Sequence, residues 1–367
     1  MKIVCTKQDL LNGLQIVSKA VPNKTTMSIL ECILIDATNN HISLTANDME
    51  LGIETIIEGN IINAGMIAID ARFFLEIVRR LPDNDVTIET DSNYNTTIIC
   101  EKSKFDILAK SGEDFASLPK IERKENIIIN QFSLKEVIHQ TIFSTIDNEN
   151  KMMSGELFQI EGNNLKVVSL DGHRVSIRNI KLRDDYVNRK LIVPGKTLNE
   201  LSKILSGDTE SDIVIYFTDN HILFEFDDTT IVSRLIEGDY FKIDKMINAD
   251  YETKININKR ELQACIDRAT LLTKEGDKKP IIMNIKDDIM ELKIKSTFGS
   301  MNEDIYINKN GKDLMIGFNP KFMMDALKVI DEEYVDLYML NSKSPCIIKD
   351  NSESYIYLIL PVNFIAI

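Results

Sequence analysis

The sequence predicts an α+β protein built from three similar domains, in which helices pack on one face of antiparallel sheets. Two observations lead to this prediction. Two different amphipathic helix patterns each occur three times, at intervals of about 125 residues. Short segments of alternating polar and apolar residues, bounded by Asn, Asp and Gly, fill the intervals between the helices.

The first helix pattern begins near residues 9, 133 and 261. Its apolar residues recur every three or four positions, which is typical of a helix with one buried face. The residues of this stripe are Leu10, Leu14, Val17 and Val21 in the first copy, Leu134, Val137, Ile138 and Thr141 in the second, and Leu262, Cys265, Ile266 and Ala269 in the third. We therefore expect one such helix near the start of each domain.

The second helix pattern spans residues 70–81, 194–205 and 319–330. Asp70 and Asn319 suit the N-cap position, because a short polar side chain there accepts a backbone N–H. Pro194 and Pro320 suit the first turn, where the missing N–H of proline is not needed.

The segments between the helices have the pattern of short strands joined by tight turns. Strands are expected at residues 32–35, 41–45, 157–160, 165–168, 213–217 and 222–226, with turns at 161–164 and 218–220. Each domain would then contain a helix, a few strands, a second helix and further strands. We place the domains at residues 1–127, 128–252 and 253–367.

The composition is that of a globular protein without a membrane segment. Of the 367 residues, 44% are hydrophobic and 27% charged, which is ordinary for a globular domain. No apolar run approaches the roughly 20 residues that cross a bilayer, and the N-terminus reads as a strand rather than a signal peptide. The five dispersed cysteines lack metal-binding spacing and suit reduced thiols. We therefore predict a cytoplasmic protein.

The net charge of −14 argues at first against a nucleic-acid partner, which normally calls for a basic protein. Net charge sums the whole surface, however, and cations can gather on one face. When the repeats are aligned, cations recur near both ends of the second helix. They are Arg72, Lys196 and Lys321 near its start and Arg79, Lys203 and Lys328 near its end, with Lys24 in the loop after the first helix. Either these cations form a functional basic surface, or they merely solvate outward helix faces.

The sequence contains no arrangement that indicates an active site or a metal centre. The four histidines are far apart, at positions 41, 139, 173 and 221, and no phosphate-binding loop or nucleophile motif is present. The acidic pairs at 227–228 and 287–288 lie in turn-like stretches, where Asp favours local backbone bonds. We therefore predict that the chain is not an enzyme and needs no cofactor or metal.

One short motif, Ser169–Val175, stands out. Its Asp171-Gly172 pair suits a tight β-turn, in which His173 and Arg174 would be incidental. A metal-binding role for His173 has no second ligand nearby in the sequence.

Four features in register with the repeats resemble the bacterial β sliding clamps of the replicative DNA polymerase. They are the three-fold repeat, the Asp171–Arg174 turn, the segment Arg234–Tyr240 and the terminal Leu358–Val362. In that family two subunits join head to tail, and six similar domains surround a hole lined by helices, with the sheets outside. The resemblance covers the whole chain. It implies a homodimeric DNA polymerase processivity factor that encircles duplex DNA without reading its sequence.

The resemblance also implies three sets of functional residues. The DNA-facing set is Lys24, Arg72, Arg79, Lys196, Lys203, Lys321 and Lys328. The ring-interface set is Phe105, Ile107, Leu271 and Leu272, although ordinary core packing would also explain these apolar residues. The pocket set is Met153, Leu170, Gly172, His173, Arg174, Val175, Phe241, Lys245, Met246, Lys343, Pro345, Leu358, Leu360, Pro361 and Val362.

In the family this pocket accepts a short peptide, often led by glutamine with leucine and phenylalanine anchors. The implied partners are the replicative polymerase, the clamp loader, repair polymerases and other proteins that carry such a peptide. The sequence departs from the usual pattern at Phe241, where relatives have Pro, at Leu170, often Thr, and at Asn363, usually Arg. These changes alter the shape and polarity of the pocket and leave the peptide preference open.

Two other functions compete with the clamp. An enzyme acting on nucleic acid is opposed by the missing catalytic residues. A repeat scaffold would use the pocket around His173 for partner proteins alone, without binding DNA.

Overall fold

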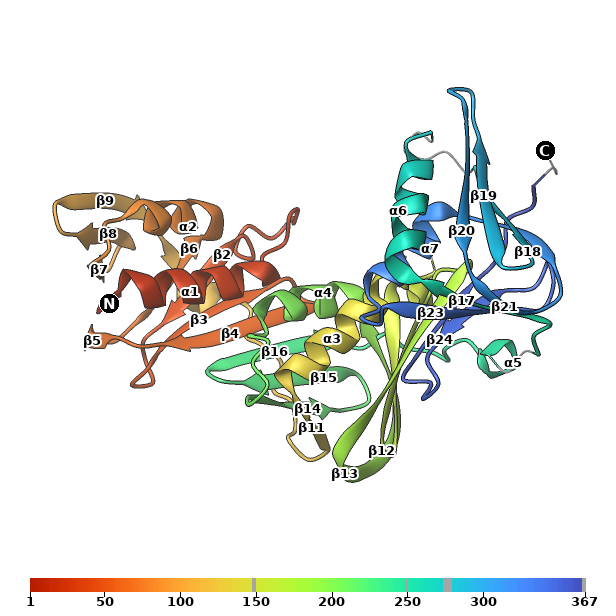
Figure 1. Cartoon of the computed structure of the whole chain (residues 1–367). Helices are drawn as coiled ribbons and strands as arrows, with labels where there is room; N and C mark the ends of the chain where they lie inside the picture. Colours follow the sequence, from red (N-terminus) through yellow and green to blue (C-terminus); the bar gives the residue numbers. More distant parts are fainter. Residues whose placement is uncertain (147–149, 248–249, 273–278, 365–367) are drawn as a thin grey trace. The chain divides into compact units, whose positions relative to one another are not determined.

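The structure, a computed structural model, describes residues 1–146, 150–247, 250–272 and 279–364. The chain forms two compact units (Figure 1). Unit 1 is Met1–Phe132 with Lys203–Leu235, and unit 2 is Ser133–Ser202 with Ile236–Ile367. The units do not coincide with the three sequence repeats, because strands of different repeats pair within each unit.

Unit 1 contains a five-stranded and a nine-stranded antiparallel sheet. The first has the order β5-β1-β7-β8-β9, with β1 (Lys2–Thr6), β5 (Asn60–Asn63), β7 (Asp85–Thr90), β8 (Asn95–Cys100) and β9 (Ser103–Leu108). The second has the order β10-β6-β2-β3-β4-β16-β15-β14-β11, with β2 (Cys32–Asp36), β3 (Ile42–Asn47), β4 (Leu51–Ile57), β6 (Met66–Asp70), β10 (Lys110–Ser111), β11 (Asn126–Asn130), β14 (Asp212–Phe217), β15 (His221–Phe226) and β16 (Thr229–Arg234). The pairing of β4 with β16, with Ile53 opposite Ile231, joins the first repeat to the second.

Helices α1 (Lys7–Val17) and α2 (Ala71–Arg80) pack against each other in unit 1. Each has a side-chain N-cap. Thr6 Oγ1 accepts the N–H of Asp9 at 3.1 Å, and the predicted cap Asp70 accepts an N–H at 2.8 Å.

Gly13 lets α1 approach the nine-stranded sheet closely. The helix lies against β3 and β4, and its predicted stripe residues Leu10, Leu14 and Val17 are buried. A Cβ at position 13 would lie 2.6 Å from Ile57 Cγ2, closer than van der Waals contact allows. A side chain here would therefore push the helix away from the sheet.

Unit 2 contains a seven-stranded and a four-stranded antiparallel sheet. The first has the order β12-β13-β25-β24-β23-β17-β21, with β12 (Gly155–Leu170), β13 (Arg174–Pro194), β17 (Thr253–Asn258), β21 (Asn308–Gly311), β23 (Tyr334–Met339), β24 (Cys346–Lys349) and β25 (Tyr355–Ile359). The second has the order β20-β19-β18-β22, with β18 (Ile281–Lys286), β19 (Ile289–Lys295), β20 (Ser300–Tyr306) and β22 (Leu314–Phe318). The pairing of β13 with β25 joins the second repeat to the third.

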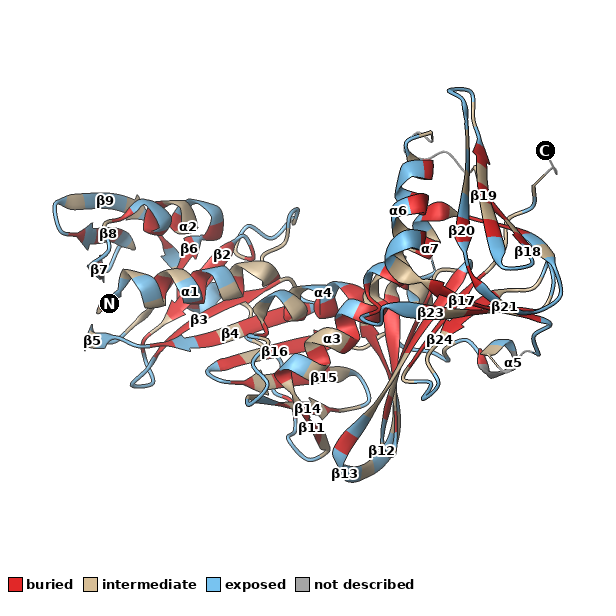
Figure 2. Ribbon diagram, viewed as in Figure 1, coloured by how far each residue is buried: buried red, intermediate tan, exposed pale blue. Residues whose placement is uncertain are grey.

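The remaining helices are α3 (Gln131–Thr141), α4 (Gly195–Ile204), α5 (Asp244–Ile247), α6 (Lys259–Thr270) and α7 (Pro320–Lys328). In unit 2, α6 and α7 pack against each other, and the predicted cap Asn319 accepts the N–H of Lys321 at 2.9 Å. Figure 2 shows buried residues on one side of α6 and exposed residues on the other. No helix within the described residues combines the length and apolar character needed to cross a membrane.

All six predicted helices are present, with small differences at their ends. Val21 lies beyond α1, after a short 3-10 helix (Ser18–Ala20), and is only half-buried. Pro194 is the last residue of β13 rather than part of α4.

The predicted turn at residues 161–164 is wrong. These residues lie inside the single long strand β12, which pairs with β13 along its whole length. The register shifts on either side of Gly162, which has a φ of 56°. Between the pairs on either side of Gly162, β13 contains more residues than β12, so the strand pair is irregular opposite the Gly-Asn segment and the chain does not reverse there. The reversal comes at residues 171–173, between the two strands.

Candidate functional site

Asp171 holds the turn between β12 and β13. Its Oδ1 accepts the backbone N–H of His173 at 2.9 Å and that of Arg174 at 3.1 Å, so the side chain stabilises a tight turn. Gly172 has a φ of 85°, a conformation that residues with a Cβ rarely adopt. The motif therefore forms a well-defined hairpin end, from which His173 is exposed.

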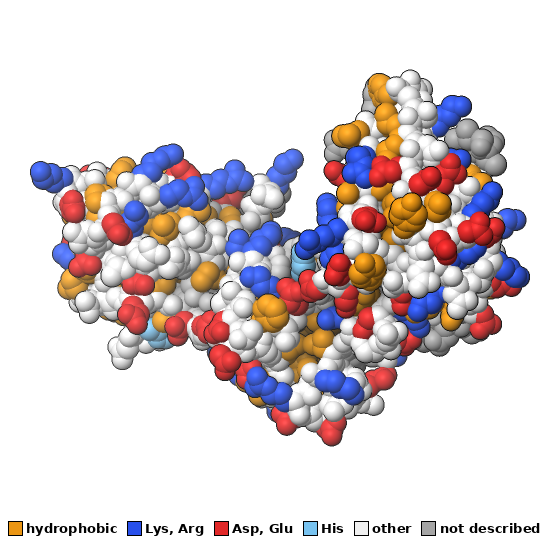
Figure 3. Space-filling view, viewed as in Figure 1, with side chains coloured by type: hydrophobic (Ala, Val, Ile, Leu, Met, Phe, Trp, Pro, Cys, Tyr) orange, Lys and Arg blue, Asp and Glu red, His pale blue; other side chains and the backbone are white. Residues whose placement is uncertain are grey.

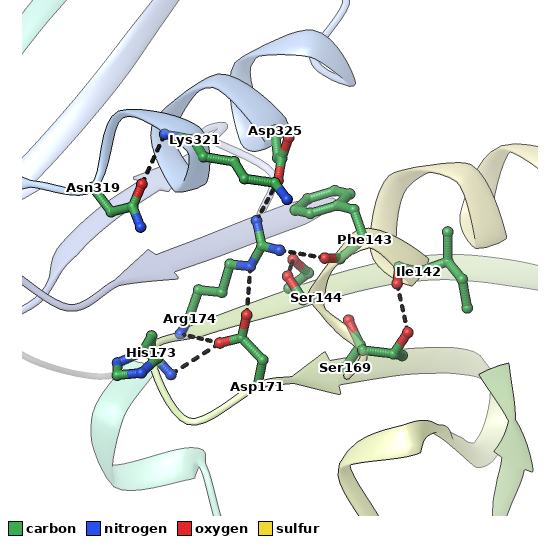
Figure 4. Close-up of polar contacts among 12 residues, drawn as sticks. Ile142, Phe143, Ser144, Ser169, Asp171, His173, Arg174, Asn319, Lys321 and Asp325 are labelled. Carbon is green, nitrogen blue, oxygen red and sulfur yellow. Dashed lines mark hydrogen bonds and ion pairs between the residues drawn. The ribbon is translucent and has the colours of Figure 1, made fainter. Parts of the chain in front are cut away.

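Arg174 is buried behind this turn, with 7% of the residue exposed. Figure 4 shows its guanidinium bonded to three acceptors. Nε donates to Asp171 Oδ2 at 2.9 Å, Nη1 donates to Asp325 Oδ2 at 2.7 Å, and Nη2 donates to the Phe143 carbonyl. The guanidinium carbon also lies 4.5 Å from the ring centre of Phe322 and 5.2 Å from that of Phe143. Two carboxylates and two aromatic rings thus compensate the desolvation of the buried charge.

A hollow of about 240 Å³ lies beside the turn. It is lined by Met153, Leu170, Gly172, His173, Arg174, Val175, Phe241, Lys242, Ile243, Met246, Leu358 and Leu360. Leu170, Val175 and Leu358 are buried and form an apolar floor, whereas Phe241 and Met246 are exposed. An apolar floor with a few polar groups beside it suits the anchoring of apolar side chains from a short peptide.

Backbone pairing and α7 hold the hollow in shape. The N–H of Leu360 donates to the His173 carbonyl at 2.9 Å, and Val175 lies opposite Leu358 in the sheet. The His173 ring stacks on Phe322 of α7, with ring centres 5.9 Å apart. One wall of the hollow is therefore supported by that helix.

A buried carboxyl lies close to the residues that support Phe241. The Phe241 ring meets the Tyr240 ring edge-on at 5.8 Å, and the Tyr240 hydroxyl donates to the Gly155 carbonyl at 3.3 Å. Burial raises the pKa of Glu156 to about 8. Burial also raises the pKa of Tyr240, and the Glu156 carboxyl raises it further. At neutral pH both groups therefore favour their uncharged forms.

The structure brings most of the predicted pocket residues together, but four lie outside the hollow. Lys343 and Pro345 belong to the loop before β24. Pro361 and Val362 continue past the wall, because the N–H of Val362 donates to the Gly317 carbonyl at 2.8 Å and directs the chain toward β22. The side chain of Lys245 lies outside the described part of the chain.

Several residues of the site were not predicted from the sequence. Lys242 and Ile243 line the hollow beside Phe241. Phe143, Phe322 and Asp325 hold Arg174 and are far from it in the sequence. The apolar Ile243 next to Phe241 offered a weak signal, whereas nothing in the local pattern pointed to Asp325.

All seven predicted DNA-facing residues have exposed side chains. In α2 the buried residues are Ala71, Phe74, Ile77 and Val78, and in α7 they are Pro320, Met323, Ala326 and Leu327. The cations therefore lie off the buried face in both helices. Figure 3 shows several Lys and Arg side chains over α2.

Two of these cations come from different repeats and line the same hollow in unit 1. Arg79 and Lys203 border one hollow of about 550 Å³, together with Lys19. Arg79 also pairs with Glu76 at 2.6 Å, and Arg72 donates to the Asn23 carbonyl at 3.4 Å, beside Lys24. Among the described residues, no group of three or more His, Cys, Asp or Glu could hold a metal ion.

Comparison with known proteins identifies the family. Models of the DNA polymerase III beta subunit match the chain in three consecutive parts, the N-terminal domain at residues 1–119, the central domain at 128–242 and the C-terminal domain at 244–363. The chain belongs to the DNA polymerase III beta subunit family, the β sliding clamps. The predicted three-domain clamp fold is thereby confirmed.

Individual β sliding clamps are similar over nearly the whole chain. The beta sliding clamp of Staphylococcus aureus is 36% identical over 356 residues, which are 94% of each chain. A solved structure described as a putative DNA polymerase III beta subunit, from Eubacterium rectale, is 66% identical, with a TM-score of 0.97 over 99% of each chain. The DNA polymerase sliding clamp of Bacillus subtilis is 33% identical, with a TM-score of 0.96 over 100% of each chain.

The predicted ring-interface residues of this clamp lie near two sheet edges. Strand β9, with Phe105 and Ile107, is the last strand of one sheet in unit 1, and β20 is the last strand of one sheet in unit 2. Phe105 borders an open hollow together with Phe73 of α2. Leu271, just after α6, is 80% exposed. Ile107 is half-buried, and Leu272 packs against the core of unit 2.

Proposed function

We propose that this chain is a DNA polymerase processivity factor, a homodimeric ring that encircles duplex DNA and tethers the replicative polymerase. The observation that carries the proposal is the match of three consecutive DNA polymerase III beta subunit domains over nearly the whole chain. In this role the chain catalyses no reaction. It keeps other enzymes on the DNA.

The seven exposed cations form the DNA-facing set in this proposal. Six of them occur at equivalent places of the second helices, and Lys24 lies in the loop after the first helix of unit 1. Lysine or arginine contacts to phosphate hold DNA without reading its sequence. The net charge of −14 then belongs to the rest of the surface, where it opposes non-specific contacts with DNA.

The ring forms by a head-to-tail contact between two copies of the chain. The exposed edges of β9 and β20 offer unpaired backbone groups that can extend a sheet across the interface. Phe105 and Leu271 supply exposed apolar area near these edges. A contact between two different surfaces closes into a ring when its rotation allows it.

The hollow beside His173 binds a short peptide of the replicative polymerase, the clamp loader or repair polymerases. Its buried floor takes the leucine and phenylalanine anchors, and the exposed polar groups beside it orient the peptide. Phe241, which is large and exposed, shapes one side of the hollow.

Retention on circular and on linear DNA tests whether the chain forms a closed ring. The clamp, loaded by the cognate clamp loader, should stay on nicked circular DNA at moderate salt and slide off linear DNA of the same sequence. Equal loss from both DNAs would exclude a closed ring. Nuclease or polymerase turnover that an acidic substitution abolishes would instead support an enzyme.

Fluorescence anisotropy tests the pocket. A labelled peptide with a glutamine followed by leucine and phenylalanine should bind the wild-type chain, and Leu360→Asp should prevent binding because it places a charge against the apolar floor. Val187→Asp is the control, since Val187 is exposed on β13 and outside the hollow. Equal affinity of all three proteins would contradict the assignment.

A further inference from the structure

Asp325 contacts the site without lining the hollow. It lies on α7, one helical turn after Lys321, and its Oδ2 accepts the Arg174 guanidinium at 2.7 Å. Its side chain is 21% exposed, and that of Arg174 is 7% exposed. The contact joins the end of the β12–β13 hairpin to a helix more than a hundred residues away in the sequence (Figure 4).

We propose that Asp325 is a positioning residue for peptide binding. It holds Arg174, and through Arg174 it holds the Asp171–Arg174 turn in the geometry that the peptide meets. This inference rests on the proposed peptide-binding function of the hollow, and it adds a residue that the peptide itself does not contact.

The geometry of the guanidinium carries the argument. The three acceptors of Arg174 come from three separate segments, namely Asp171 in the turn, the Phe143 carbonyl after α3, and Asp325 in α7. Without Asp325 the buried cation keeps only one carboxylate. A buried charge that loses a partner must find another or move toward water, and either change is costly.

The turn would respond directly to such a movement. Asp171 binds the Arg174 guanidinium with Oδ2 and the backbone N–H groups of His173 and Arg174 with Oδ1. A shift of the guanidinium therefore pulls on the carboxylate that sets the turn. His173 and Gly172, which both line the hollow, move with it.

A second residue of α7 also supports the turn and Arg174. Phe322 of α7 stacks on the His173 ring and lies under the Arg174 guanidinium. The exposed residues Lys321 and Lys328 of α7 belong to the proposed DNA-facing set. One helix therefore supports the peptide site with Phe322 and Asp325 while it offers cations to DNA.

Peptide affinity of Asp325 variants tests the inference. Measured by anisotropy with the labelled glutamine, leucine and phenylalanine peptide, Asp325→Ala should weaken binding about tenfold, as expected for a lost bond to a charged group. Asp325→Asn should weaken it less, because the amide oxygen still accepts a hydrogen bond. The double variant Arg174→Ala with Asp325→Ala should bind no more weakly than Arg174→Ala alone, because Asp325 acts through Arg174.

Controls separate this role from general destabilisation. Asp331→Asn, an exposed acid in the loop after α7, should keep wild-type affinity. Asp325→Ala should not reduce retention on nicked circular DNA, since it removes a negative charge near the α7 lysines. Wild-type affinity in both Asp325 variants, or additive losses in the double variant, would overturn the inference. Failure of the wild-type chain to bind the peptide, or binding that survives Leu360→Asp, would instead refute the pocket.

Discussion

At the scale of single residues, the site depends on buried polar groups whose partners come from distant parts of the chain. Arg174 is neutralised by acids in the β12–β13 turn and in α7. No cation is among the groups that shift the pKa of Glu156, and burial is the largest cause of its rise. Two acids compensate the burial of the Arg174 charge, whereas the buried Glu156 carboxyl favours its protonated form at neutral pH.

Glu156 makes the stability of the chain depend on pH. Its pKa is about 8 in the folded chain, against an ordinary value of 4.5. Its contribution to stability is therefore complete below about pH 4.5 and is lost as the pH rises through about 8. We expect the free energy of unfolding to fall by about 2–3 kcal/mol between roughly pH 6 and 8 because of this group. Glu156→Gln should lack this decline in urea denaturation series at several pH values.

An exposed acid on the same strand provides the comparison. Glu161→Gln removes a carboxyl from β12 at an exposed position, and it should keep the wild-type pH dependence. Parallel pH curves for Glu156→Gln and the wild type would mean that the buried carboxyl does not take up a proton on folding.

Single residues of the site were predictable only where the contact is local or the family motif is specific. The turn at Asp171 and Gly172 follows from short-range chemistry, since an Asp side chain and a Gly at positive φ both favour reversal. The bond between Arg174 and Asp325 spans two repeats, and no periodicity or local motif encodes it. Lys343 and Pro345 entered the predicted pocket by resemblance alone and lie outside the hollow.

At the scale of elements, the three second helices repeat one pattern of burial. Each of α2, α4 and α7 buries most of its apolar residues and leaves exposed cations near its two ends. A helix that packs on a core with one face and meets a partner with another requires such a distribution, with apolar residues on the first face and charged residues on the second.

Removal of the α7 cations should weaken DNA binding without affecting peptide binding. In a filter-binding salt series, Lys321→Ala with Lys328→Ala should lower DNA affinity and reduce the slope of log affinity against log salt by about 0.9 for each lost phosphate contact. Lys286→Ala with Lys295→Ala, at exposed strand positions, removes the same charge and should change little. An equal effect of both pairs would show that net charge alone governs binding.

Packing of α1 on its sheet should not tolerate a side chain at Gly13. Gly13→Leu would force the helix away from β3 and β4, and we expect a loss of about 1–3 kcal/mol in the free energy of unfolding. Gln15→Leu adds the same side chain to an exposed position of α1 and should leave the thermal midpoint nearly unchanged. Similar midpoints for the two variants would show that the contact can relax.

Helices were more predictable than strands for a physical reason. The stripe residues of α1, α3 and α6 are mostly buried as expected, because the pattern of a two-sided helix is long enough to be distinctive. The sequence predicts two strands where the structure has the single long strand β12. Gly162 and its polar neighbours have the composition of a turn when the partner strand is unknown. The pairing of β12 with β13 makes it a single strand, and strand pairing depends on residues outside the segment itself.

At the scale of the whole molecule, the sequence repeats and the compact units divide the chain differently. Sheets cross the repeats through the β4–β16 and β13–β25 pairings, so the second repeat contributes strands to both units. The proposed boundaries at 127 and 252 stay a prediction, and the first of them falls within β11. The same kind of edge-to-edge strand pairing would continue the chain into a second subunit at β9 and β20.

A head-to-tail ring makes a prediction that a dimer joined through two identical surfaces does not. Phe105→Asp damages only the β9 surface, and Leu271→Asp damages only the surface beside α6. Each variant alone has no intact interface and should be a monomer of 41.8 kDa by light scattering, whereas the wild type should have about twice that mass.

Mixing the variants in equal amounts restores one intact interface, so a dimer should reappear at high concentration. That dimer is open, and it should leave nicked circular DNA as readily as linear DNA. An interface that pairs the β9 surface with its own copy would instead leave Leu271→Asp a dimer by itself, and one that pairs the surface beside α6 would leave Phe105→Asp a dimer.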